Sequence, residues 1–207
     1  MKLPQIEPMM LSRVAAPFDH PDFLFELKQD GFRCIAYISE SRCDLVSRRK
    51  YSYKSFDSLK TALAKLKAMD AILDGEICCL DSQGRSQFNE LLYRRGEPLL
   101  YCFDLLWLNG QDLRQLQLIE RKKRLHKLIA KSRCKRVICA RHIAKHGTAL
   151  YQEICERDLE GIVAKRRDSV YSSAGQWLKI LNPNYTQHNG RHEKFTAFKE
   201  RSRRASV

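Results

Sequence analysis

Apolar and polar positions alternate over short stretches of this chain, and turn-forming residues separate one stretch from the next. Short runs of this kind predict β-strands. One strand begins at Phe23 and carries Lys28 toward its end, where Asp30-Gly31 predicts a sharp turn. Further strands are predicted at 33–39, 44–47, 71–80, 99–107, 137–140, 161–164 and 177–181.

Apolar residues recur at helical spacing elsewhere in the chain. In residues 58–69, Leu59, Leu66 and Met69 fall on one side of a helix that Asp57-Ser58 would cap. Other helices are predicted at 88–96, 118–129 and 148–157. Strands and helices follow one another irregularly, and several strands are joined by short turns. This order favours an α+β fold of mainly antiparallel sheets flanked by helices over a doubly wound parallel fold.

The chain of 207 residues is 43% hydrophobic, which suffices for one substantial core. We predict one domain over residues 23–187. Residues 1–22, which contain four prolines, are expected to form an irregular lead-in. Residues 188–207 are expected to form a basic, partly disordered tail.

A formal net charge of +14 predicts attraction to polyanions, with nucleic acid as the leading partner and an anionic membrane surface as the lesser one. Nine Lys or Arg residues and no acidic residue lie within 121–136. We interpret the helix at 121–131, together with the tail, as a surface for DNA phosphates; a solvated helix face is the alternative. No apolar run approaches the length that crosses a bilayer, so we expect no membrane partner and a cytoplasmic protein.

Lys28 is the first candidate for chemistry. Lysine acts as a nucleophile only when its amine is neutral, which burial or nearby positive charge favours, and Arg33 is one source of such charge. The alternative is an ordinary β-hairpin with solvated side chains, because Asp-Gly is above all a turn signal. Lys28 and its neighbours do not separate the two interpretations.

Polar residues at the ends of other predicted strands change this balance. In chain order the segments are Glu26-Leu27-Lys28-Gln29-Asp30-Gly31, Asp74-Gly75-Glu76, Phe103-Asp104, Glu160-Gly161-Ile162-Val163-Ala164-Lys165 and Trp177-Leu178-Lys179-Ile180. They match motifs I, III, IIIa, IV and V of the covalent nucleotidyltransferases. The chain therefore resembles the adenylation domain of ATP-dependent DNA ligases, in particular the bacterial end-joining type, over roughly residues 7–185.

The resemblance implies a covalent nucleotidyltransferase fold, ATP-grasp-like, that uses ATP and Mg²⁺. Lys28 would take AMP from ATP and pass it to a DNA 5′-phosphate for the sealing of a nick or break. The roles implied for the other residues are these: Glu26 lies near the adenine amino group, Arg33 and Glu76 hold the ribose, Phe103 stacks on the base, Glu160 binds the metal ion, and Lys179 and Lys165 neutralise phosphate charge.

Two departures from the family pattern matter. Motif V usually has a second lysine two residues after the first, and here that position is Leu181. The sequence also ends about 25 residues after motif V, so we expect no C-terminal oligonucleotide-binding (OB) barrel in this chain, and a protein partner that supplies one would complete a ligase.

The departures leave an alternative from a different class, a catalytically weak module that binds nucleotide or DNA ends. RNA ligation or RNA capping fits the flanking sequence less well. A zinc site at His142 and His146 lacks an evident third ligand.

Overall fold

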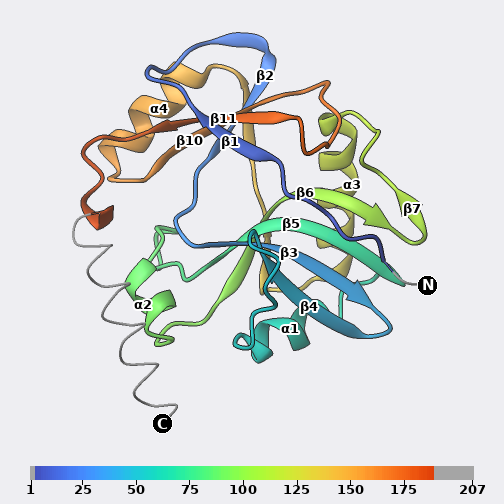
Figure 1. Cartoon of the computed structure of the whole chain (residues 1–207). Coiled ribbons are helices and arrows are strands. Elements are labelled where there is room, and N and C mark those ends of the chain that lie inside the picture. Colours follow the sequence, from blue (N-terminus) through green and yellow to red (C-terminus); the bar gives the residue numbers. More distant parts are fainter. Residues whose placement is uncertain (1–2, 189–207) are drawn as a thin grey trace.

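The computed structural model describes residues 3–188, which form two β-sheets that face one another (Figure 1). We call them the upper and the lower sheet after their places in Figure 1. The upper sheet has the order β1-β11-β10-β2-β9, with bounds β1 Met10–Arg13, β2 His20–Leu27, β9 His142–Lys145, β10 Gly161–Arg166 and β11 Gln176–Leu181. The lower sheet has the order β4-β3-β5-β6-β7, and β8 also pairs with β6. Its bounds are β3 Phe32–Ser39, β4 Arg42–Ser47, β5 Asp70–Cys78, β6 Leu99–Leu108, β7 Gln111–Asp112 and β8 Val137–Cys139.

Helices cover the outer faces of both sheets (Figure 1). Helix α4, Gly147–Glu156, packs on β2 and β10 of the upper sheet. Helix α3, Leu118–Ser132, packs on β6 and β8 of the lower sheet, and α1, Asp57–Leu63, packs on β4. A short helix α2, Phe88–Leu92, lies between β5 and β6 in the sequence. A 3-10 turn at Thr186–His188 follows β11. Within residues 3–188, no helix has both the length and the apolar character that a bilayer crossing requires.

Alternation along the strands gives each sheet two different faces. In β2, Phe25 is fully buried under α4 together with Ile154 and Ile162, whereas its neighbour Glu26 points to the opposite face. Successive side chains of a strand point to opposite faces, so one apolar position in two is enough to seat the helix. The other face of β2 is thereby free to carry polar side chains into the space between the sheets.

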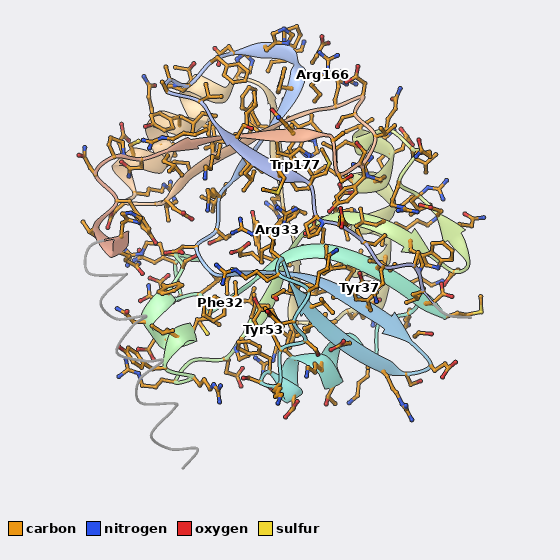
Figure 2. All side chains as sticks on the ribbon, in the orientation of Figure 1. Phe32, Arg33, Tyr37, Tyr53, Arg166 and Trp177 are labelled. Atoms are coloured by element: carbon orange, nitrogen blue, oxygen red, sulfur yellow. The ribbon has the colours of Figure 1, made fainter. Side chains whose placement is uncertain are left out.

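Part of that space is filled by apolar side chains. Ile35, Ile72 and Leu106 of the lower sheet pack against Val163 and Trp177 of the upper sheet. Figure 2 shows the Trp177 and Arg33 side chains in this layer between the sheets. The apolar layer fixes the separation of the two sheets, and a polar pocket adjoins it.

Phe103 lies at an irregular point of β6. Gly75 of β5 pairs with Cys102, and the preceding Asp74 pairs with Asp104, so Phe103 has no partner on β5. An extra residue of this kind is a β-bulge, which changes the direction of side chains around it. Phe103 lines the pocket between the sheets, and Asp104 turns toward α3.

Helix α3 is fastened to β6 by a fully buried ion pair. The Nε and Nη2 atoms of Arg121 donate to the two carboxylate oxygens of Asp104, each at 2.8 Å. The Nη1 atom donates to the carbonyl oxygens of Leu116, at 2.6 Å, and Ser169, at 2.9 Å. A buried guanidinium is tolerated only when its donors are used in this way.

The predicted α+β class with mainly antiparallel sheets is confirmed, and within residues 3–188 only the pairs β1–β11 and β6–β8 are parallel. The helix predicted at 58–69 is wrong beyond Leu63, where turns replace it. These turns still bury Leu66, but Met69 is 75% exposed. Spacing alone could not separate the helix from the turns, because both bury Leu66.

The lead-in predicted at 1–22 is not irregular throughout. Strand β1 lies within it and pairs in parallel with β11, and β2 already begins at His20. Strands β7 and β9 were not predicted either. These short strands lie beside partners that only the fold supplies, so they carry little local signal. The predicted tail lies, from residue 189 on, outside the described residues.

The predicted phosphate-binding helix needs a correction at two positions. The side chains of Arg121 and Lys122 are buried, so neither belongs to the outer surface of α3. Both point inward because carboxylates of the sheets, Asp104 and Glu26, form ion pairs with them. The exposed basic residues of this helix are Lys123, Arg124, Lys127 and Lys131.

We expect Asp104→Ala to lower the free energy of unfolding by about 3–5 kcal/mol, because it leaves the Arg121 guanidinium buried without its carboxylate. Urea denaturation measures the loss. Glu120→Ala is the matched control on the same helix, since it removes an exposed pair with Lys123 and should change stability by less than about 1 kcal/mol. Equal effects of the two substitutions would contradict a structural role for the buried pair.

Candidate active site

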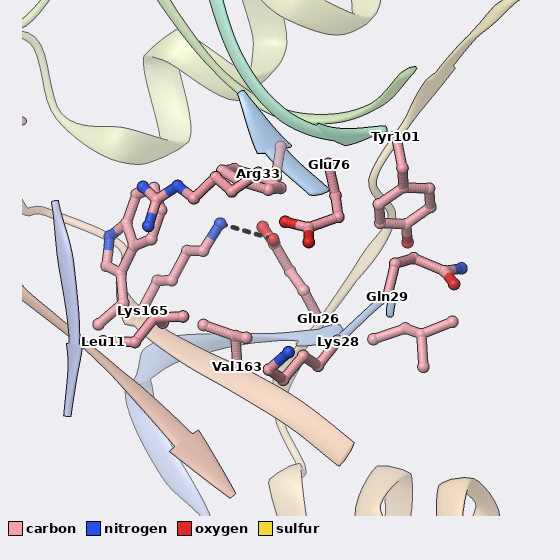
Figure 3. Close-up of a pocket in the computed structure, with 12 residues that line it drawn as sticks. Leu11, Glu26, Lys28, Gln29, Arg33, Glu76, Tyr101, Val163 and Lys165 are labelled. Carbon is pink, nitrogen blue, oxygen red and sulfur yellow. Dashed lines mark hydrogen bonds and ion pairs between the residues drawn. The ribbon is translucent and has the colours of Figure 1, made fainter. Parts of the chain in front are cut away.

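A pocket lies between the two sheets, next to their apolar layer, and six of the eight predicted site residues line it (Figure 3). These six are Glu26, Lys28, Arg33, Glu76, Phe103 and Lys165. The remaining lining residues are Leu11, Leu27, Gln29, Tyr101, Val163 and Trp177. The pocket thus combines residues from both sheets that are far apart in the sequence.

Lys28 follows directly after the last residue of β2. Its backbone N–H donates to the carbonyl oxygen of Gly161 in β10, at 2.9 Å. Its Nζ atom lies 2.7 Å from the Oε2 atom of Glu160, and the side chains of Lys28 and Glu160 are 19% and 13% exposed. The first and fourth motifs therefore meet at one point, where an ammonium group contacts a carboxylate at the mouth of the pocket.

The turn after Lys28 is held tightly. A Cβ atom on Gly31 would lie 2.1 Å from the carbonyl oxygen of Ile77, so only glycine fits this approach of the turn to β5. The buried Asp30 receives the Tyr185 hydroxyl on its carboxylate, at 3.2 Å, and its backbone N–H donates to the Ser86 hydroxyl at 3.1 Å. These contacts fix the direction in which the chain leaves Lys28.

Glu26 is buried between two lysines. Its Oε1 atom lies 2.5 Å from Nζ of Lys122, and its Oε2 atom lies 2.7 Å from Nζ of Lys165. Figure 3 shows the contact with Lys165 as a dashed line. Burial acts to raise the pKa of Glu26, but the two ammonium groups outweigh it, and the pKa is lowered from its usual value. Glu26 is therefore a carboxylate at neutral pH.

Lys165 occupies the aromatic side of the pocket. Its Nζ atom lies 3.9 Å from the centre of the Trp177 ring and 4.3 Å from that of Phe103, distances at which cation–π attraction is strong. Burial lowers the pKa of Lys165, and Lys122 also acts to lower it, against the attraction of Glu26. The face on which Phe103 was predicted to stack a base is thus contacted by an ammonium group in this structure.

Arg33 is anchored to the lower sheet and to the segment before β1. Its Nε and Nη2 atoms donate to the two Asp74 oxygens at 3.1 and 2.8 Å, and Nη1 donates to the carbonyl oxygen of Met9 at 2.7 Å. The Tyr171 hydroxyl donates to the same Asp74 carboxylate at 2.6 Å. Three of the five guanidinium N–H donors are used in these bonds, which leaves two for a ligand.

Glu76 points into the pocket from β5, directly beside Arg33 of β3 in the sheet register (Figure 3). Burial raises the pKa of Glu76 to about 7; Lys28 and Arg33 act to lower it, and Glu160 and Asp30 act to raise it. A carboxyl group poised near neutral pH in a cleft is typical of a functional site.

Lys179 and Glu160 are the predicted residues that do not line the pocket itself. Glu160 is connected to the pocket by the hydrogen bond that its Oε2 atom accepts from the Lys28 Nζ atom. Lys179 pairs with Val163 of β10 and with Arg13 of β1, which places it on the same sheet face as Trp177. For zinc, the described residues contain no group of three or more metal-binding side chains. His142 lies in β9 and His146 directly precedes α4, so no single helix carries them both.

Sequence reasoning missed two partners of the site. Lys122 was counted as a surface charge, although it lies at helical spacing from the buried Leu118 and Leu125, and this position was the signal for burial. Trp177 was part of a motif but received no role. Nothing in the local sequence indicates that Lys122 would contact Glu26, which lies 96 positions away.

Comparison with known proteins gives a consistent picture. The profile of the family described as "ATP dependent DNA ligase domain" matches residues 8–180. The chain is 33% identical over 183 residues to the multifunctional non-homologous end joining protein LigD of Pseudomonas aeruginosa, covering 84% of this chain and 22% of that protein. It is 28% identical over 195 residues to the SPbeta prophage-derived DNA ligase-like protein LigB of Bacillus subtilis, covering 88% of this chain and 69% of that protein.

Among solved structures, a mycobacterial DNA ligase D complexed with ATP and MES is similar with a TM-score of 0.71 at 26% identity. The match covers 83% of this chain and 58% of that chain. This chain therefore spans little more than half of that structure, and less than a quarter of the Pseudomonas protein.

We expect the raised pKa of Glu76 to make stability depend on pH. Its folded-state pKa of about 7 lies above its usual 4.5, so the folded state holds the proton more tightly, and the free energy of unfolding falls as pH rises through this interval. The fall amounts to about 3 kcal/mol. Urea denaturation of the wild type and Glu76→Gln between pH 5 and pH 8 measures it, because glutamine does not titrate. A difference between the two proteins that stays constant with pH would contradict the raised pKa, and Glu120→Gln is the exposed control.

Proposed function

Because this chain belongs to the family of ATP-dependent DNA ligase domains, we propose that it is an adenylation domain whose Lys28 carries AMP from ATP to a DNA 5′-phosphate. The observation that carries the proposal is the meeting of Lys28 with Glu160 at the mouth of the pocket that Glu26, Arg33 and Glu76 line. The Nζ lone pair forms a bond to the α-phosphorus of ATP, the bond from that phosphorus to the bridging oxygen breaks, and pyrophosphate leaves. A stored phosphoramidate divides one difficult exchange into two easier ones.

Lys28 attacks only as a neutral amine. In this structure its Nζ atom contacts the Glu160 carboxylate. Glu160 is also the residue that we propose for Mg²⁺. One carboxylate suits this ion when phosphate oxygens provide other ligands. The ion supplies positive charge next to the phosphates. Coordination of the ion by Glu160 would compete with the contact between Glu160 and Lys28.

For the nucleoside, we propose that the base stacks on Phe103 with its amino group toward Glu26. Arg33 has two N–H donors left for the ribose, and Glu76 can accept or donate a hydrogen bond there because it titrates near neutral pH. Lys179 and Lys165 would neutralise phosphate charge. For Lys165 this role requires that its ammonium group leaves Glu26.

DNA is the proposed second substrate. The net charge of +14 and the exposed basic side chains of α3 supply sequence-independent attraction to phosphates. A protein partner or further domain that provides an oligonucleotide-binding barrel is part of this proposal. The alternative, a binding module with weak catalysis, is favoured by Leu181, which stands where the family has a lysine.

We expect incubation with α-labelled ATP and Mg²⁺ to leave label on the wild type after denaturing electrophoresis. Lys28→Ala should remove all label, because it removes the proposed nucleophile, while the nearby amines of Lys122 and Lys165 remain paired with Glu26. Lys50→Ala is the control, since Lys50 forms an exposed pair with Glu7 away from the pocket. An unlabelled wild type at every protein concentration and pH would sink the enzyme proposal. If label forms, its transfer to a nicked duplex separates a ligase from a stalled AMP carrier.

We expect Leu181→Lys to accelerate the labelling step. Leu181 ends β11 on the same sheet face as Lys179, so an amine there adds a second cation for the phosphates. A gain of about tenfold corresponds to 1.4 kcal/mol of transition-state stabilisation. Single-turnover labelling measures the rate, with Leu181→Met as the neutral control. An unchanged or slower rate would show that the missing lysine does not limit this chain.

A further inference from the structure

The two lysines that contact Glu26 differ in their surroundings. Lys122 comes from α3, outside the residues that line the pocket. Its Nζ atom donates to Glu26 Oε1 at 2.5 Å and to the Ala140 carbonyl oxygen at 3.1 Å, and the Phe103 carbonyl oxygen lies at 3.5 Å. An ammonium group has three N–H donors, so these three acceptors account for all of them.

Lys165, by contrast, lies inside the pocket. Its Nζ atom has a hydrogen bond to Glu26 Oε2 and lies over the Phe103 and Trp177 rings. The directions of the pKa shifts agree with this difference. Burial acts to lower the pKa of Lys122, but Glu26 outweighs it and the pKa is raised, whereas burial lowers the pKa of Lys165. Lys122 is therefore the fixed counter-ion of Glu26, and Lys165 is the exchangeable one.

A nucleobase that enters this pocket competes with Lys165 at both of its contacts. A base stacked on Phe103 takes the aromatic face, and an exocyclic amino group directed at Glu26 takes the Oε2 atom. One movement of Lys165 frees both positions. After that movement Lys122 is the cation left in contact with the Glu26 carboxylate.

We propose that Lys122 is a positioning residue for base selection, which holds the Glu26 carboxylate in place as an acceptor when Lys165 gives way to the base. The inference rests on the proposed function, because it takes the adenine amino group to lie at Glu26. Lys122 lies outside the five motifs, and an exposed side chain on α3 could not hold Glu26 in this way.

Base selection follows from hydrogen-bond polarity. A carboxylate accepts the N–H of a 6-amino purine, whereas the 6-oxygen of hypoxanthine is itself an acceptor and is repelled. Buried polar sites reject such mismatched ligands strongly. Without Lys122, Lys165 is the only cation in contact with Glu26 and stays there, so it obstructs the aromatic face and shares the carboxylate with the base.

The test compares ATP with ITP, which differ at the 6-position, in Lys122→Met, Lys122→Gln and Lys122→Arg. Labelling kinetics give KM and kcat, and quenching of tryptophan fluorescence, to which the pocket residue Trp177 contributes, gives equilibrium binding without chemistry. We expect Met and Gln to raise the KM for ATP about tenfold with little change in kcat, and to reduce the preference for ATP over ITP about tenfold. Arg keeps the positive charge and should keep most of the preference. Lys50→Met removes an exposed pair and should change neither quantity.

An ATP preference that is unchanged in Lys122→Met or Lys122→Gln overturns the inference, even if the KM for ATP rises. If Lys122→Met does not fold, the Gln and Arg variants decide, and equal preferences in these two variants overturn it. A wild type that binds ATP but is never labelled defeats the proposed function alone, and the binding preference then still judges Lys122. A wild type that binds neither nucleotide defeats both.

Discussion

Burial of charge between and behind the two sheets is the constraint on which the rest of this structure depends. Glu26, Asp74 and Asp104 are each at most 2% exposed, and each is ionically paired with side chains from another element. A single unpaired carboxylate in such a place would cost several kcal/mol. Ion pairs to these carboxylates thus join α3 to β6 and β2, β3 to β5, and β10 to β2.

The charged side chains of this structure differ in how completely they are paired. The Asp104 and Arg121 side chains are both fully buried and use their hydrogen-bonding groups within the fold, which suits them to fastening α3. Around the pocket the pairing is less complete. Arg33 keeps unused donors, and Lys165 shares Glu26 with a second lysine. Groups of this second kind can change partners when a ligand arrives, and they lie where the family motifs converge.

The β-bulge at Phe103 connects the two roles. At this point consecutive residues of β6 lie on opposite sides of the lower sheet, with Phe103 in the pocket and Asp104 under α3. Alternation alone places neighbours on opposite faces, and a bulge also changes the local direction of the strand. The Phe103 ring contacts Trp177 and Lys165. The lining of the pocket and the attachment of α3 therefore meet at one point of the chain.

The sequence by itself determined most strands, the helices at both outer faces, the turn after Lys28 and the order of five motifs, because periodicity and turn chemistry act over a few neighbouring residues. The motifs in the sequence also identified most of the candidate site, since six of the residues that they suggested line one pocket. Only the tertiary structure decided that Lys122 pairs with Glu26 and Arg121 with Asp104, that Met10–Arg13 forms a strand, and that Lys165 contacts Glu26 139 positions away. The physical reason is that a local pattern reports which face of an element is buried, whereas the partner on that face is set by long-range packing.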